Sequence, residues 1–196
     1  MDFQFIFSLI ILLFSVVIHE IAHGYAALCL GDKTAEYEGR LTLNPIKHID
    51  PIGTILLPAI SLMLPGGFIF GWAKPVPFNP YNLRNRRWGE AIVAAAGPFS
   101  NFALALIFGS IIRFILVPQG LLNGPIGQLS AIIVLVNVTL AIFNLVPIPP
   151  LDGSKILTSI LPPRFMNLRN QIERFGFFGV IIFLVFIWQF FAPLIP

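Results

Sequence analysis

Two histidines four residues apart, with a glutamate directly after the first, are the strongest chemical signal in the sequence. His19, Glu20 and His23 lie within an apolar run that extends from Phe3 to Leu30. Positions i and i+4 of a helix lie one turn apart on the same face. Two imidazoles at that spacing can bind one Zn²⁺, and the carboxylate between them can reach a water molecule on the metal. The motif therefore predicts a catalytic zinc site inside a membrane.

The competing interpretation is chance, because the same five-residue pattern occurs in soluble helices that bind no metal. Membrane burial argues against chance here. Ionisable groups near the centre of a spanning helix cost on the order of 2.5 to 3.5 kcal/mol each on insertion scales. A cluster of three such groups in one apolar segment is therefore expected to have a function.

A third ligand is needed, because catalytic zinc sites usually have three protein ligands and one open position. Three prolines between positions 147 and 150 precede Asp152. Prolines remove helix donors and favour extended backbone, so we expect Asp152 on a stiff, strand-like segment just past a helix end. We predict that Asp152 is the third ligand. In the alternative interpretation, its side chain only caps a helix that starts near Ser154.

The composition indicates an integral membrane protein with one domain, residues 1–196. Of the 196 residues, 57% are hydrophobic and only 11% are charged, and the mean hydropathy is +0.87. Ordinary soluble domains carry about 25% charged residues. The single cysteine, Cys29, excludes an internal disulfide and a cysteine-based zinc cluster. The net charge of +3 is small and the basic residues cluster in connecting segments, so we expect no nucleic-acid partner.

The apolar pattern predicts an all-α membrane protein, a polytopic bundle of about four spanning helices plus one re-entrant helix/strand hairpin. A short strand is expected over 39–45. The hairpin is expected at 52–70, because its helical part would reach only some 20 Å, less than the roughly 30 Å of a hydrocarbon core. Its return through 68–76 is expected to be extended. The expected spanning segments are 3–30, 91–117, 127–146 and 176–192.

The basic residues favour re-entry of 52–70 over a full crossing. Re-entry gathers eleven of the twelve on one side of the membrane and leaves only Arg113 on the other, as the positive-inside rule requires. The eleven are Lys33, Arg40, Lys47, Lys74, Arg84, Arg86, Arg87, Lys155, Arg164, Arg169 and Arg174. We therefore expect a multi-pass cell-membrane protein with its site toward the cytoplasmic side, bordered by the hairpin.

Three sequence elements together resemble the site-2 protease family of zinc intramembrane metalloproteases. They are the His-Glu-x-x-His motif at 19–23, a Gly-Pro-x-x-Asn pattern at 97–101, and Asn-Leu-Val-Pro at 144–147 followed by Leu-Asp-Gly at 151–153. Their order agrees with that of the family, and the resemblance covers most of the chain. The chain is similar to minimal members that carry no PDZ or CBS domain.

The resemblance implies a role for each matching residue. His19, His23 and Asp152 would be the ligands of one Zn²⁺ per chain, and Glu20 would be the general base. Asn144 would be a catalytic polar group beside the metal, donating to the substrate or its oxyanion. An alternative for Asn144 is that it only satisfies backbone groups.

Three further polar or small residues are expected to lie outside the site. For Gly97 we favour close helix packing over a role in the site, and for Asn101 we favour a hydrogen bond to backbone groups or a bridge between helices. His48 is expected to be exposed in a loop.

These predictions favour a zinc-dependent intramembrane endopeptidase whose partners are the lipid bilayer and membrane-spanning or membrane-associated substrates. The alternative is a transporter that passes Zn²⁺ or protons with the same residues. A transporter needs polar groups across the bilayer, and the other leaflet offers little beyond Gln128, Asn137 and Thr139. A binding protein without turnover is disfavoured because ligation alone does not require Glu20. The sequence identifies neither the physiological substrate nor the oligomeric state.

A last hypothesis concerns the extended segment over 71–78. Its unpaired backbone groups could pair with a locally unwound substrate as an added strand.

Overall fold

The structure is a computed structural model that describes residues 3–56, 59 and 72–162. Within these ranges three helices are long and apolar enough to cross a membrane. They are α1 (Phe3–Cys29), α4 (Gly89–Ile111) with its π-helical continuation η4 (Ile112–Leu116), and α5 (Pro125–Asn144). These helices confirm the first three predicted spanning segments. The predicted fourth, 176–192, lies outside the described residues.

The outer surfaces of the three long helices are apolar, as a lipid environment requires. Large hydrophobic side chains are exposed along all three. They include Phe7, Leu9, Phe14, Phe99, Leu106 and Leu135. Together with the length of the helices, this confirms an all-α membrane protein.

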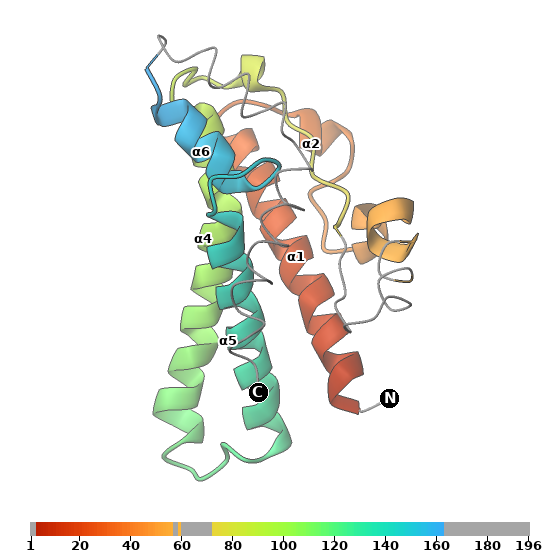
Figure 1. The fold of residues 1–196 in the computed structure, drawn as a ribbon, viewed down its shortest axis with the longest axis vertical. Coiled ribbons are helices and arrows are strands. Elements are labelled where there is room, and N and C mark those ends of the chain that lie inside the picture. The colour runs from red at the N-terminus through yellow and green to blue at the C-terminus, as the bar shows by residue number, and fades with distance from the viewer. Residues whose placement is uncertain (1–2, 57–58, 60–71, 163–196) are drawn as a thin grey trace, which may run out of the picture.

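The helices form a compact group in which α4 and α5 are an antiparallel pair and α1 packs against both (Figure 1). The short loop after η4 joins α4 to α5 at one end. The C-terminal ends of α1 and α5, the N-terminal end of α4, and helix α6 (Asp152–Ile160) all lie at the other end. The chain between α1 and α4 therefore starts and finishes at the same end of the bundle. Most of the predicted hairpin over 52–70 lies outside the described residues.

Helix α1 ends where the sequence permits a left-handed turn. Gly31 has φ +105°, and the amides of Gly31 and Asp32 donate to the carbonyls of Leu28 and Ala27, both at 2.9 Å. This is a Schellman cap, in which glycine avoids the steric cost of a Cβ. The cap turns the chain so that Asp32 points into the protein, where it is buried.

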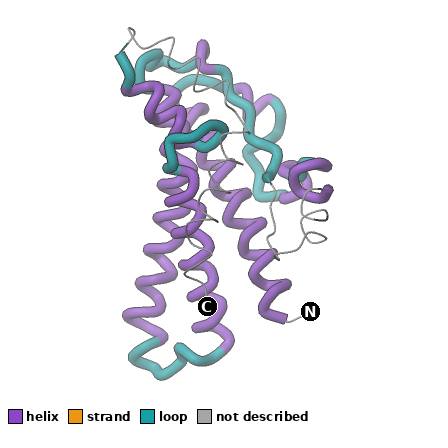
Figure 2. Tube along the Cα trace, in the orientation of Figure 1, coloured by secondary structure: helices purple, strands orange, loops and turns teal. Residues whose placement is uncertain are grey.

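Where the structure describes it, the chain between α1 and α4 consists of loops and short helices (Figure 2). The short helices are α2 (Thr34–Tyr37), η1 (Pro45–His48), η2 (Pro51–Leu56) and η3 (Pro80–Asn82).

The predicted strand over 39–45 is wrong. Gly39 has φ +61° and turns the chain. Its neighbour Arg40 then points inward and donates to the carbonyls of Lys74 and Pro75. The carbonyl of Thr42 faces the His48 ring at 2.9 Å from Nε2. Contacts with distant segments therefore replace the backbone pairing that a strand would make here.

Candidate metal and catalytic site

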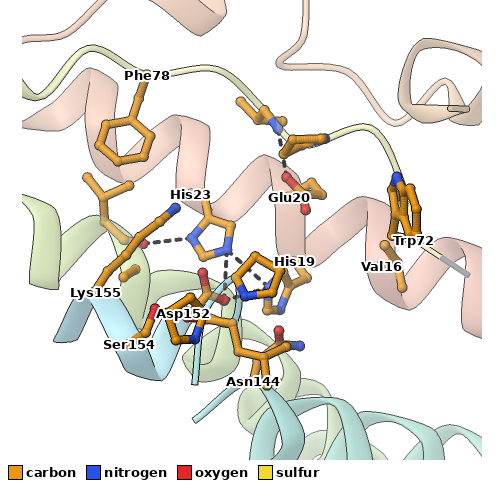
Figure 3. A pocket seen from close by; sticks show the side chains of 18 of the residues that line it. Val16, His19, Glu20, His23, Trp72, Phe78, Asn144, Asp152, Ser154 and Lys155 are labelled. Atoms are coloured by element: carbon orange, nitrogen blue, oxygen red, sulfur yellow. Dashed lines mark hydrogen bonds and ion pairs between the residues drawn. The ribbon is translucent and has the colours of Figure 1, made fainter. Parts of the chain in front are cut away.

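Two histidines of α1 and one carboxylate from the start of α6 meet beside α4, against which both α1 and α6 pack (Figure 3). His19 Nε2 lies 3.0 Å and His23 Nε2 3.2 Å from Asp152 Oδ2. The two Nε2 atoms lie 3.0 Å apart. All three side chains are buried. The structure thus brings together the three residues that the sequence predicts as metal ligands.

Asp152 reaches this position differently from the prediction. It is the first residue of α6 and does not lie on an extended segment. The proline-rich stretch before it ends at Leu151, and the helix begins at the next residue. The Leu151 carbonyl accepts a hydrogen bond of 2.7 Å from the Ser154 hydroxyl in the first turn. Leu151 is the N-cap residue and no side chain caps α6, so the capping alternative for Asp152 is also wrong.

The proton positions on the two imidazoles follow from their outer partners. His23 Nδ1 lies 2.7 Å from the carbonyl oxygen of Val93, which can only accept, so the proton of a neutral His23 is on Nδ1. His19 Nδ1 lies 2.5 Å from Asn101 Oδ1, another acceptor. Both Nε2 atoms therefore present lone pairs toward Asp152.

Three acceptor atoms facing one another at about 3 Å are repulsive unless a cation lies between them. Two imidazole nitrogens and one carboxylate oxygen are a donor set found at catalytic zinc sites, with a fourth position left for water or substrate. The arrangement of the three residues therefore fits Zn²⁺.

Gly97 on α4 provides the space that the two imidazoles occupy. A Cβ at this position would lie 2.5 Å from His19 Nε2 and from His23 Cε1, and closer still to His23 Nε2. No side chain fits between α4 and the rings. The glycine thus allows helix packing, as expected, but the surface it packs against is the metal site itself.

Glu20 lies next to the histidines with one carboxylate oxygen held and one open. Oε2 accepts a hydrogen bond of 2.7 Å from the amide of Val76. Within the described part of the chain Oε1 accepts none. This geometry leaves Oε1 for proton transfer while Oε2 fixes the orientation of the side chain.

The site opens into a cavity of about 820 Å³. Glu20 and Asn144 both line it, as do the three metal-site residues. Asn144 Nδ2 donates 3.0 Å to the carbonyl of Leu140 on its own helix, which leaves its second N–H for another acceptor. The apolar part of the wall includes Val16, Trp72, Val76, Phe78, Leu140 and Phe143.

One asparagine makes a contact that was not expected, and one histidine is placed differently from expectation. Asn101 bridges helices as expected, since its Nδ2 donates 2.7 Å to Asn137 Oδ1 on α5, but its Oδ1 also contacts His19 directly. The signal that could have identified Asn101 is its spacing of four from Gly97, which puts both on the face of α4 toward α1. His48, expected to be exposed, is only 1% exposed, because its ring lies against the Thr42 carbonyl.

Comparison with known proteins gives a consistent result. The sequence model of "Peptidase family M50" matches residues 7–187. "Putative zinc metalloprotease YwhC" from Bacillus subtilis is 40% identical over 184 residues, 91% of this chain and 78% of that protein. "Putative zinc metalloprotease Rip2" from Mycolicibacterium smegmatis is 30% identical over 173 residues, 88% of this chain and 64% of that protein. No solved structure matches the chain.

Proposed function

The chain belongs to peptidase family M50 and is a zinc metalloprotease, and from this premise we propose that it cleaves peptide bonds of membrane-spanning or membrane-associated substrates. The observation that carries the proposal is the position of His19, Glu20 and His23 on α1, a helix long and apolar enough to span a membrane. A protease with its ligands on such a helix meets its substrate at or within the bilayer.

In the proposed mechanism His19, His23 and Asp152 hold the zinc ion. The chemistry that zinc supplies when bound is Lewis-acid activation of water and of the scissile carbonyl. Glu20 Oε1 takes the proton of the attacking water and later gives it to the leaving amine. The hydrogen bond from the Val76 amide keeps Glu20 oriented through both transfers.

Asn144 completes the proposed catalytic set. It lies on the wall of the same cavity, and one of its amide N–H groups is not used by Leu140. That N–H can donate to the substrate carbonyl, where negative charge develops during attack. Removing one such donor costs on the order of 10²- to 10³-fold in turnover in other hydrolases.

The cavity favours peptides with apolar side chains. Most of its described lining is aliphatic or aromatic, and the charged residues of that lining, beyond the candidate metal site and Glu20, are Glu90 and Lys155. We propose that the substrates are single spans, tail anchors or signal-peptide remnants, whose apolar side chains match this wall.

The active site is proposed to face the cytoplasm. Basic residues gather around the end of the bundle that carries the site, in the segments that follow α1 and precede α4. Arg113, near the other end of α4, is the exception. The positive-inside rule assigns the more basic end to the cytoplasm.

The test uses Glu20→Gln and a reporter that carries a single spanning segment, both reconstituted in liposomes. The variant is expected to bind one zinc per chain and to lose cleavage, because the amide can accept from Val76 but cannot take a proton. Glu38→Gln, which changes an exposed carboxylate after α2, is the control and is expected to cleave normally. Full cleavage by Glu20→Gln would reject the proposed mechanism.

Zinc flux into liposomes distinguishes the transporter alternative. Transport would be favoured over proteolysis by two results together: the unmodified protein does not cleave the reporter, and zinc flux persists in Glu20→Gln.

A further inference from the structure

A row of buried amide side chains connects α5 to the first histidine by way of α4. Asn137 Oδ1 accepts from Asn101 Nδ2 at 2.7 Å, and Asn101 Oδ1 lies 2.5 Å from His19 Nδ1. At its far end Asn137 Nδ2 donates 2.9 Å to the hydroxyl of Ser15 and 2.9 Å to the carbonyl of Ile133. The row thus links all three long helices of Figure 1 within the apolar part of the bundle.

The direction of this row is fixed at the Ile133 carbonyl. A carbonyl only accepts, so the NH₂ group of Asn137 must face Ile133 and its oxygen must face Asn101. Because that oxygen also only accepts, Asn101 must present its NH₂ group to Asn137 and its oxygen to His19. His19 must then donate from Nδ1, which leaves the lone pair of Nε2 for the metal.

Burial enforces this order. Asn101 and Asn137 are both 0% exposed, so water cannot replace a lost partner. A flipped Asn101 amide would put its oxygen against Asn137 Oδ1 and its NH₂ group against the His19 N–H. An unsatisfied polar group in such a place costs about 1–3 kcal/mol. If the His19 ring stayed in place and accepted a hydrogen bond at Nδ1, the proton of the neutral ring would be on Nε2. Nε2 could then not bind the ion.

We propose that Asn137 is a positioning residue that fixes the metal-binding tautomer of His19 through Asn101. The proposal rests on the ligand role of His19 in the proposed function. Asn137 touches neither His19 nor the other predicted ligands in the described contacts, so its effect is transmitted by one amide. Ligating histidines are commonly fixed by an acceptor on the second ring nitrogen, and loss of such partners typically costs 10- to 100-fold in metal affinity.

The first experiment measures zinc affinity by chelator competition for the purified full-length chain and for Asn137→Leu, a substitution of similar size without an acceptor. We expect affinity to fall about 10-fold. The visible spectrum of the Co²⁺-loaded variant should also change, because it reports the ligands directly. Ser130→Ala, which removes a different buried polar group from α5, is the matched control and is expected to change neither readout.

A double-mutant comparison separates positioning from packing. In an Asn101→Asp background the carboxylate accepts from His19 Nδ1 whatever lies at position 137. Asn137→Leu should therefore lower zinc affinity in the unmodified background and not in the Asn101→Asp background. A loss of equal size in both backgrounds, or no loss in either, would overturn the proposal.

Two further variants keep the test decisive. Asn137→Ala removes the same acceptor without adding bulk, so it replaces Asn137→Leu if that variant does not fold. His19→Ala tests the premise separately. Normal zinc binding by His19→Ala would reject the ligand assignment, whereas normal binding by the Asn137 variants alone would reject only the role of Asn137.

Discussion

Replacement of Gly97 by alanine tests whether the closeness of α4 to the imidazoles matters for metal binding. The added Cβ would lie 2.5 Å from His19 Nε2, whereas ordinary contacts of a Cβ begin at 3.4 Å. The rings or the helix must therefore move by at least about 0.9 Å, because the Cβ would lie closer still to His23 Nε2. Zinc–ligand distances tolerate changes of only about 0.2 Å. We expect zinc affinity to fall and cleavage to fall with it.

The size of the effect follows from the cost of overpacking. Extra methyl groups in a well-packed interior cost about 1–3 kcal/mol. If the metal-bound state carries that cost, zinc affinity falls roughly 5- to 150-fold, because each 1.4 kcal/mol is a factor of ten.

The assay is chelator competition on protein in detergent, with metal content measured after dialysis. Gly109→Ala is the matched control, since it lies on the same helix and its Cβ would meet nothing within 4 Å. Equal zinc affinity in Gly97→Ala, Gly109→Ala and the unmodified chain would refute the reasoning.

Three further predictions concern the loops and the metal. Asp32 accepts hydrogen bonds from the Asn79 amide, the Asn82 side chain and Thr34; burial raises the pKa of its carboxyl, but these bonds outweigh burial and lower it from 3.8. Asp32→Asn should therefore lower the free energy of unfolding by about 1–3 kcal/mol above pH 4. Thermal unfolding should show this difference between the two proteins disappear as the pH falls through the lowered pKa of Asp32. Ala73→Pro should slow cleavage of long substrates while zinc content stays normal, because no described residue accepts from the Ala73 amide and a substrate strand could; unchanged cleavage would reject strand pairing. Removal of zinc by a chelator should abolish cleavage and lower the melting temperature, and both should return on adding zinc; activity that survives complete removal would contradict zinc catalysis.

The spanning helices and the grouping of His19, His23 and Asp152 could be predicted from the sequence because each depends on local pattern. A long apolar run fixes a spanning helix, and the spacing of His19 and His23 on that helix fixes their common face. The position of Asp152 beside them followed from charge asymmetry, which requires α1 and α5 to end on the same side. These inferences needed no knowledge of side-chain contacts.

The remaining features depend on contacts between distant segments. The alternation over 39–45 suggested a strand, but Arg40 turns inward to carbonyls more than thirty residues away. His48 is buried for a similar reason. From the sequence, Asn137 is only one of the few polar residues expected in the other leaflet, and the packing of α5 on α4 joins it to Asn101 and the candidate metal site. Local sequence carries no signal for such pairs.

The most direct test of the whole account is X-ray absorption at the zinc edge of the purified chain, with metal content determined on the same sample. We expect one zinc per chain, with nitrogen and oxygen neighbours at about 2.0–2.2 Å, and loss of the two-imidazole signal in His23→Ala. A spectrum dominated by sulfur at about 2.3 Å, or an unchanged imidazole signal in His23→Ala, would contradict the assignment of the ion to His19, His23 and Asp152.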